Sequence, residues 1–353
     1  MRKPKRVRST GRRRLRALLL APLAACLLLT LAWITWTETH PEQERDLRLA
    51  VQERLETWFP DEMALPPDRL GFIPLSQPDH ALERPHVLLL HGLDEPGGIW
   101  DDLAPALQQA GIEAWEFRYP NDQAIDHSAD LLAEHWPQLG DDGAVVLIGH
   151  SMGGLVIREF VSRLRHPAHQ TPALGGTTVR GVILIGTPNH GSEWARLRVW
   201  LGVRNLVASI PQREFSLFAA LRDGTGVAKI DLRPGSRFLE DLNAREWPDA
   251  VPVRIIGGVI TEPTSEMREN LNALASQAGA GDLVLRFERW LDELGEGLGD
   301  GAVPLQSLEL SHAPPPVVVS ASHRGMLVRT PLSDEQSEPP AIPEILAILD
   351  EWR

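Results

Sequence analysis

Cysteine is almost absent from the chain, because Cys26 is the only one among 353 residues. A single thiol cannot form a disulfide within the chain, whatever the compartment. Positive charge is also scarce beyond residues 1–16, which carry nine Lys or Arg and no acid, while the whole chain has a formal charge of −13. The strongly acidic remainder argues against a nucleic-acid partner. No internal repeat is evident, and a 43% hydrophobic content is ample for one large α/β domain.

Charge is missing altogether from the twenty residues 17–36. As a helix this stretch would reach ~30 Å, enough to cross a hydrocarbon core. Trp33 and Trp36 stand at its far end, where indoles favour the membrane interface. We therefore expect a single-pass signal-anchor, with 1–16 as a basic cytoplasmic tail and the rest of the chain extracytoplasmic, which means periplasmic in a Gram-negative cell. A cleaved signal peptide ending near 30–32 and a lipoprotein box at 23–26 remain as alternatives, giving a secreted protein or a lipoprotein.

Residues 37–67 are predicted to form a helical stalk or linker, with an amphipathic helix over 40–59 and prolines after it. In the large domain predicted over 68–353, apolar runs alternate with helical patterns, which is typical of a mostly parallel sheet flanked by helices. The fold class is therefore α/β. The strands are expected at 71–75, 86–91, 112–119, 144–148, 179–185, 251–260 and 316–320, and the helices at 125–136, 155–164 and 342–352.

Two stretches are longer than ordinary connections between strands. Residues 193–247 contain many apolar side chains and are predicted to form a helical cap or lid over the site. The alternative is an extra helical layer that only packs against the domain. Residues 264–299 hold two helical patterns and are predicted to be a helical insertion. The sequence does not decide whether this insertion adds to the cap.

A serine stands at the centre of the most informative stretch, 144–157. An apolar run rich in β-branched residues meets Gly149-His-Ser-Met-Gly153, and a helical pattern follows. This order predicts a strand, a sharp turn with Ser151 at its apex, and a helix whose first amides point at whatever the serine oxygen attacks. Gly149 and Gly153 are needed because a Cβ at either position would strike the neighbouring strand or helix. The alternative is an ordinary turn that happens to hold a serine.

A candidate oxyanion hole follows the strand at 86–91. His91-Gly92-Leu93 would place the Leu93 amide opposite that of Met152, giving two N–H donors for a developing oxyanion. His91 and His190 are expected to shape the pocket by hydrogen bonding. His150 is expected to point away from the nucleophile.

The acid and the base are expected after the last strands. His323 stands just past the strand at 316–320, where an imidazole can take the Ser151 proton and donate to an acid. Asp300 lies in a Gly-Asp-Gly turn and is the preferred acid. Its rivals are Asp282, Asp249 and Glu193, and His312 is the rival of His323. The resulting order, Ser, Asp, His, is that of α/β-hydrolases.

With these residues in place, the chain resembles the lipase-like α/β-hydrolases, the group of bacterial triacylglycerol lipases and lipase-like inositol deacylases, over about 86–327. The resemblance implies hydrolysis of carboxylic esters, often lipid esters, with no cofactor, and we assign no metal ligand. The matching segments are Leu90-His-Gly-Leu93, Gly149-His-Ser-Met-Gly-Gly154, Gly186-Thr-Pro-Asn-His-Gly-Ser192, Leu232-Arg-Pro-Gly-Ser-Arg-Phe-Leu239, Asp300-Gly-Ala-Val-Pro304 and Ser322-His-Arg-Gly-Met326.

The sequence thus predicts a membrane-anchored serine ester hydrolase that acts on lipid or other acyl esters. A thioesterase, amidase or acyltransferase would use the same triad and the same acyl-enzyme. From another class, a non-catalytic scaffold or a chaperone for another lipase would keep the fold without the chemistry. The sequence leaves the oligomeric state open.

Overall fold

The structure is a computed structural model that describes residues 25, 28–75, 84–93, 98–193, 224–260, 297–329 and 338–352. The chain divides into two units, Met1–Leu47 and Arg48–Arg353. In the first unit residues 28–39 are helical, and the rings of Trp33 and Trp36 lie 5.2 Å apart.

The predicted transmembrane helix at 17–36 gains no support from the structure. Across the ranges given above, no helix is both long and apolar enough to cross a membrane. Residues 17–24, 26 and 27 of the predicted segment lie outside the described residues.

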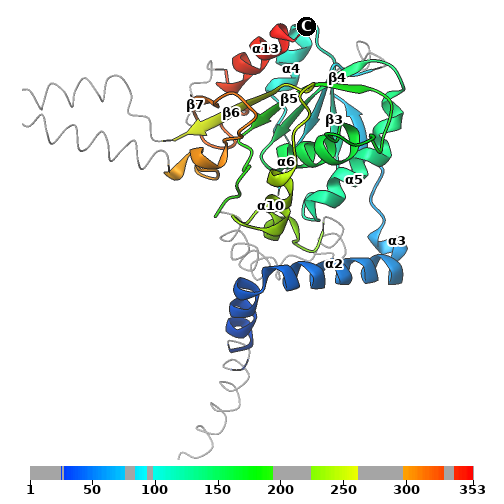
Figure 1. The fold of residues 1–353 in the computed structure, drawn as a ribbon, viewed down its shortest axis with the longest axis vertical. Coiled ribbons are helices and arrows are strands. Elements are labelled where there is room, and N and C mark those ends of the chain that lie inside the picture. Colours follow the sequence, from blue (N-terminus) through cyan, green and yellow to red (C-terminus); the bar gives the residue numbers. More distant parts are fainter. Residues whose placement is uncertain are drawn as a thin grey trace, which may run out of the picture. The chain divides into compact units, whose positions relative to one another are not determined.

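The second unit is built around a seven-stranded sheet in the order β1-β3-β2-β4-β5-β6-β7 (Figure 1). Strand β1 pairs antiparallel with β3, and all other neighbours are parallel, which confirms the predicted mostly parallel sheet. The strands are β1 Gly71–Pro74, β2 Val87–Leu90, β3 Ala114–Arg118, β4 Ala144–His150, β5 Thr178–Ile185, β6 Val253–Val259 and β7 Val317–Ser320. The helices are α2 Pro41–Trp58, α3 Pro60–Met63, α4 Leu103–Gln109, α5 Ile125–His135, α6 Met152–Glu159, α9 Ala228–Asp231, α10 Arg237–Ala244 and α13 Ala341–Glu351, with 3₁₀ turns η1 Trp136–Leu139 and η3 Leu305–Ser307 and a π-helix, η2 Phe160–Arg165.

Two apolar layers enclose the sheet because successive strand residues point to opposite faces. Leu88 and Leu90 of β2 face the layer formed by α5, α6 and α10, whereas Val87 and Leu89 face α4 and α13. Figure 1 shows α4 and α13 together on one face and α5, α6 and α10 on the other. With both faces covered, the central strands read as the continuous apolar runs expected for a parallel sheet.

Two helical features differ from the expectations. Helix α4 was not predicted. Helix α6 begins at Met152, as the predicted serine turn requires, and then continues into η2, whose π-helical geometry was not predicted. The glycines at 153 and 154 are poor helix formers, so helix propensity alone does not favour the first turn of α6. Tertiary packing forms that turn nevertheless.

The described part of the predicted cap, 224–247, packs into the core rather than standing apart from it. It contains α9 and α10, and its apolar side chains are buried in the layer shared with α5 and α6. Residues 194–223 of that cap, and 264–296 of the predicted insertion, lie outside the described residues.

Candidate active site

Ser151 lies in a strained turn between β4 and α6. Its φ of 55° and ψ of −126° place a residue with a side chain in a region that favours glycine. The Ser151 amide donates to the carbonyl of Ile185, 2.8 Å away, which holds the turn against the end of β5. The serine is therefore presented at the carboxyl end of the sheet by a backbone that the surrounding structure keeps under strain.

The glycines around the serine are required by close backbone approach. A Cβ at Gly149 would lie 2.5 Å from the amide nitrogen of Gly154, and one at Gly153 would lie 2.2 Å from the carbonyl oxygen of Leu90. A Cβ at Gly92 would lie 2.8 Å from that of Ser151. The loop after β2 and the first turn of α6 therefore pack closely around the serine, with no room for a side chain at these three positions.

Asp300 and His323 form a hydrogen-bonded pair. Nδ1 of His323 lies 2.7 Å from Oδ2 of Asp300, whose side chain is 1% exposed. The other carboxylate oxygen, Oδ1, accepts from the amides of Ala302 at 2.8 Å and Val303 at 2.7 Å. The His323 amide also donates to the Asp300 carbonyl at 2.8 Å. With Nδ1–H donated to the carboxylate, the neutral ring keeps the lone pair of Nε2 for another group.

Gly186, the first residue after β5, connects this pair with the serine turn. A Cβ on Gly186 would lie 3.0 Å from Oδ2 of Asp300 and 3.1 Å from Cε1 of His323, and its φ is 54°. The residue before it, Ile185, accepts the amide of Ser151. Serine and histidine therefore flank one stretch of backbone. No hydrogen bond joins these two described side chains, a link that commonly tightens only when substrate binds.

The two predicted oxyanion donors come from two segments that are far apart in the sequence, the serine turn and the loop after β2. Met152 is the first residue of α6, where the amides have no partner within the helix. Leu93 is buried in the loop whose Gly92 packs on Ser151. Their convergence on one oxygen stays a prediction, and residues 94–97 lie outside the described part of the chain.

The three other predicted histidines lie in different surroundings. His150 donates from Nε2 to the His323 carbonyl at 3.0 Å, so it points at the backbone of His323 and supports the position of that residue. Burial first, and then the nearby charge of His323, hold the pKa of His150 well below its usual range, so it stays neutral. His91 is buried beside Gly92, whereas His190 is exposed and donates to the Glu309 carbonyl at 3.0 Å.

The rival residues have other surroundings in the part of the chain that the structure describes. His312 stacks on Trp247, with ring centroids 5.3 Å apart. Asp249 and Glu193 are exposed, and Asp282 lies outside the described residues. Among the described residues, no group of three or more His, Cys, Asp or Glu side chains is arranged to hold a metal ion.

Tyr119, the single tyrosine of the chain, is a candidate supporting residue that the sequence did not reveal. Its ring stacks on His91 with centroids 4.5 Å apart, and its Oη donates to the His91 carbonyl at 2.5 Å. Burial, reinforced by the nearby Glu116, raises the pKa of the phenol, so the hydroxyl keeps its proton and remains a donor. Tyr119 therefore fixes the carbonyl immediately before Gly92.

We expect Tyr119→Phe to lower kcat for an ester substrate about tenfold while KM changes little. The lost hydrogen bond is worth on the order of 1 kcal/mol, and it holds the loop that carries the predicted Leu93 donor. Steady-state kinetics and thermal unfolding would be measured on the same samples. A lower melting temperature with unchanged kcat would show that Tyr119 serves stability alone.

A mostly parallel sheet with a serine in a strained strand–helix turn, and a buried Asp–His pair beside it, defines the architecture of an α/β-hydrolase. The sequence model described as "Alpha/beta hydrolase family" matches residues 87–347. The chain belongs to this family. A search of curated proteins found no match.

Several solved structures are similar to this chain. A metagenomic carboxyl esterase aligns with a TM-score of 0.50 at 16% identity, over 77% of each chain. The mature lipase BlEst2 of Bacillus licheniformis aligns with a TM-score of 0.49 at 17% identity, over 79% of this chain and 97% of its own. The lipase of Staphylococcus hyicus gives 0.49 at 15% identity, over 78% and 97%. At 16% identity, the likeness to the metagenomic esterase bears on the fold and not on the substrate.

Proposed function

We propose that this protein is a serine hydrolase of carboxylic esters that forms an acyl-enzyme on Ser151. The observation that carries the proposal is the 2.7 Å bond between His323 and the buried Asp300, beside a serine with a φ of 55°. The lipid or acyl nature of the ester is part of the proposal. It comes from the motifs at 186–192, 232–239 and 300–304, which resemble those of lipases.

The proposed reaction assigns one role to each group. Nε2 of His323 takes the Ser151 proton as Oγ attacks the acyl carbon, while Asp300 stabilises the imidazolium through Nδ1–H. The oxyanion is held by the amides of Leu93 and Met152. His323 then gives its proton to the leaving alcohol, and the acyl–Oγ ester remains. Water, deprotonated by His323, attacks that ester, and the acid leaves as the proton returns to Ser151.

The test is hydrolysis of p-nitrophenyl esters from acetate to palmitate by the full chain. We expect turnover that is lost in His323→Asn and kept in His169→Asn. His169 is a suitable control because its side chain is 82% exposed and its φ of 56° suits asparagine. A preference for long chains would support a lipase-like substrate. Equal rates in wild type and His323→Asn would contradict the proposed base.

We also propose that residues 17–36 anchor the protein in a membrane with the hydrolase domain on the extracytoplasmic side. The basis is the sequence alone: nine cations in 1–16 followed by twenty uncharged residues. Alkaline carbonate extraction of membranes should leave the protein in the pellet. Its release in intact form would contradict an anchor.

A further inference from the structure

Ser192, a buried serine that the proposed reaction does not use, connects three of the segments that resemble those of lipases. It is the last residue of the segment 186–192. Its amide donates to the carbonyl of Leu232, 2.9 Å away, and Leu232 begins the segment 232–239. Its hydroxyl donates to the carbonyl of Ala302, two residues after Asp300 in the stretch 300–309, here called the acid loop. One side chain thus links the loop after β5 to the loop that carries Asp300.

The backbone beside Ser192 has little freedom to move. Gly191 has a φ of 90°, and a Cβ on it would lie 2.6 Å from the backbone nitrogen of Pro234. The Gly191 carbonyl accepts from Oγ of Ser307 at 2.6 Å, which joins the same loop to the acid loop a second time. The hydroxyl of Ser192 is therefore held against the acid loop by backbone that is packed on one side and hydrogen-bonded on the other.

The carbonyl that Ser192 binds belongs to a peptide unit that also binds the Asp300 carboxylate. The Ala302 C=O and the Val303 N–H are the two polar groups of this one planar, trans peptide unit. The N–H donates to Oδ1 of Asp300 at 2.7 Å. Because the C=O and N–H of a trans peptide point in opposite directions, a donor that fixes the carbonyl also fixes the direction of the N–H. Ser192 thus orients a hydrogen bond to Asp300 from the far side of the peptide.

We propose that Ser192 is a positioning residue for the Asp300 carboxylate, an assignment that rests on the proposed function of Asp300 and His323 as acid and base. While Oδ1 is held by the peptide, Oδ2 faces Nδ1 of His323 at 2.7 Å. Hydrogen bonds in such a chain polarise one another, and a bond to an ionised carboxylate is stronger than a neutral one. Without the Ser192 hydroxyl the peptide and the carboxylate are free to rotate, and the bond from His323 to Oδ2 weakens.

The first measurement is the proton NMR signal of the His323 Nδ1–H, recorded on the full chain. A proton held between an imidazole and a carboxylate at 2.7 Å resonates far downfield of the backbone amides, and its absence in His323→Asn assigns the signal. We expect the signal to be shifted upfield or lost in Ser192→Ala. This readout needs no turnover. A wild-type chain with the signal and without ester hydrolysis would contradict the proposed function, whereas an identical signal in Ser192→Ala would overturn the positioning role.

Steady-state kinetics show whether Ser192 acts through Asp300. Ser192→Ala should lower kcat for a p-nitrophenyl ester about tenfold with little change in KM, because the lost bond serves the acid and does not contact the ester. In the Asp300→Asn background the same change should lower kcat by no more than about twofold, because the carboxylate that it orients is absent. Equal losses in the two backgrounds would overturn the proposal.

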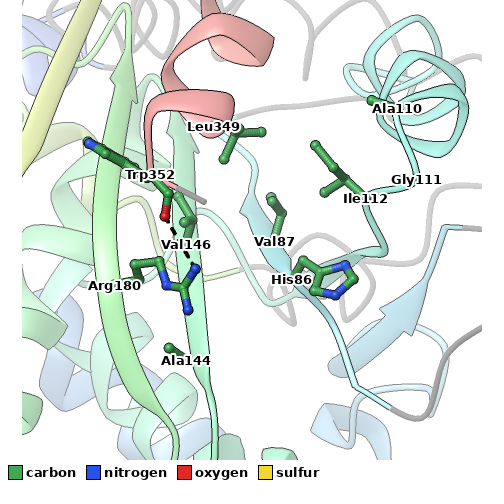
Figure 2. Close-up of a pocket in the computed structure, with 10 residues that line it drawn as sticks. All are labelled: His86, Val87, Ala110, Gly111, Ile112, Ala144, Val146, Arg180, Leu349 and Trp352. Carbon is green, nitrogen blue, oxygen red and sulfur yellow. Dashed lines mark hydrogen bonds between the residues drawn. The ribbon is translucent and has the colours of Figure 1, made fainter.

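Two control variants remove a bond from a side chain to a carbonyl elsewhere in the fold. Ser162 is 6% exposed, as Ser192 is, and donates to the Arg158 carbonyl at 2.7 Å in the helical segment after the serine turn. Arg180, near the start of β5 and thus at the opposite end of the sheet from Ser151, donates to the Trp352 carbonyl at 3.2 Å (Figure 2). Ser162→Ala and Arg180→Met should keep the kcat and the NMR signal of wild type.

Ser192→Thr keeps the hydroxyl and should restore both the kcat and the NMR signal that Ser192→Ala loses. The melting temperature of every variant is measured on the same samples. A lower melting temperature in Ser192→Ala, with kcat and the His323 signal unchanged, would mean that the serine only stabilises the fold and would overturn the proposal.

Discussion

Replacing Ser151 by alanine should lower kcat/KM for an ester substrate by 10⁵–10⁶-fold, on the order seen when a triad nucleophile is removed. The proposed covalent step needs the Ser151 oxygen, and no other described side chain occupies the strained apex between β4 and α6. Labelling by a fluorophosphonate probe should be lost in the same variant. The measurement is initial-rate kinetics with a p-nitrophenyl ester, together with in-gel detection of the probe.

The matched control for this prediction is Ser162→Ala. Ser162 is also buried, but its hydroxyl donates to the Arg158 carbonyl at 2.7 Å within the helical segment after the turn. Activity and labelling should persist in this variant. Retention of either one in Ser151→Ala would remove Ser151 from the mechanism.

Ser151→Gly separates chemistry from strain. Glycine adopts a φ of 55° freely, so this variant should be inactive yet more resistant to unfolding than wild type, by about 1 kcal/mol or more. Chemical denaturation measures the difference. A destabilised glycine variant would show that the serine turn is not strained in the folded protein.

The local parts of the site could be predicted from the sequence because they depend on neighbours in the chain. A β-branched run, a glycine pair and a helical pattern indicate a strand–turn–helix with Ser151 at its apex, and the structure has this geometry. The same holds for most of the strands, whose apolar runs are long and continuous. Helix α4, with seven residues and no strong pattern, was not recognised.

The contacts between distant segments could not be predicted in this way. Tyr119 and His91 are 28 residues apart, and only the parallel pairing of β2 with β3 makes their rings stack. Thr187 packs so closely on α6 that a Cβ at Gly154 would lie 2.0 Å from its hydroxyl. Gly154 has a low helix propensity, but its lack of a side chain lets Thr187 pack closely on α6. This packing helps to form the helix. His190, expected in the pocket, is exposed because the loop after β5 turns it toward the carbonyl of Glu309.

The choice of Asp300 over its rivals leads to the second large effect. Asp300→Asn should lower kcat about ten-thousand-fold, the order of loss known when such an acid is replaced by its amide. The amides of Ala302 and Val303 both donate to Oδ1, so the oxygen of an asparagine must stay there and its NH₂ group must replace Oδ2. That NH₂ group would then face Nδ1 of His323, which lies 2.7 Å from Oδ2.

Two donors cannot share one hydrogen bond, so the imidazole in the variant must carry its proton on Nε2 and accept through Nδ1. The nitrogen that should take the Ser151 proton is then already protonated, and the base is lost although every heavy atom is in place. Labelling of Ser151 by the fluorophosphonate should become slow rather than absent, because the nucleophile itself remains. Time-resolved labelling and kcat therefore report the same defect independently.

Asp249→Asn is the matched control, since Asp249 is an exposed rival that shows no contact with His323. Its kcat should equal that of wild type. A normal kcat for Asp300→Asn with a large loss for Asp249→Asn would mean that the chain rearranges on binding substrate and that the buried Asp–His pair is structural. If kcat falls in Asp300→Asn but not in Asp249→Asn, the reaction needs the carboxylate oxygen Oδ2. The other oxygen, Oδ1, accepts the same hydrogen bonds from Ala302 and Val303 in both side chains. The effect would therefore report the protonation of His323 and not a change of fold.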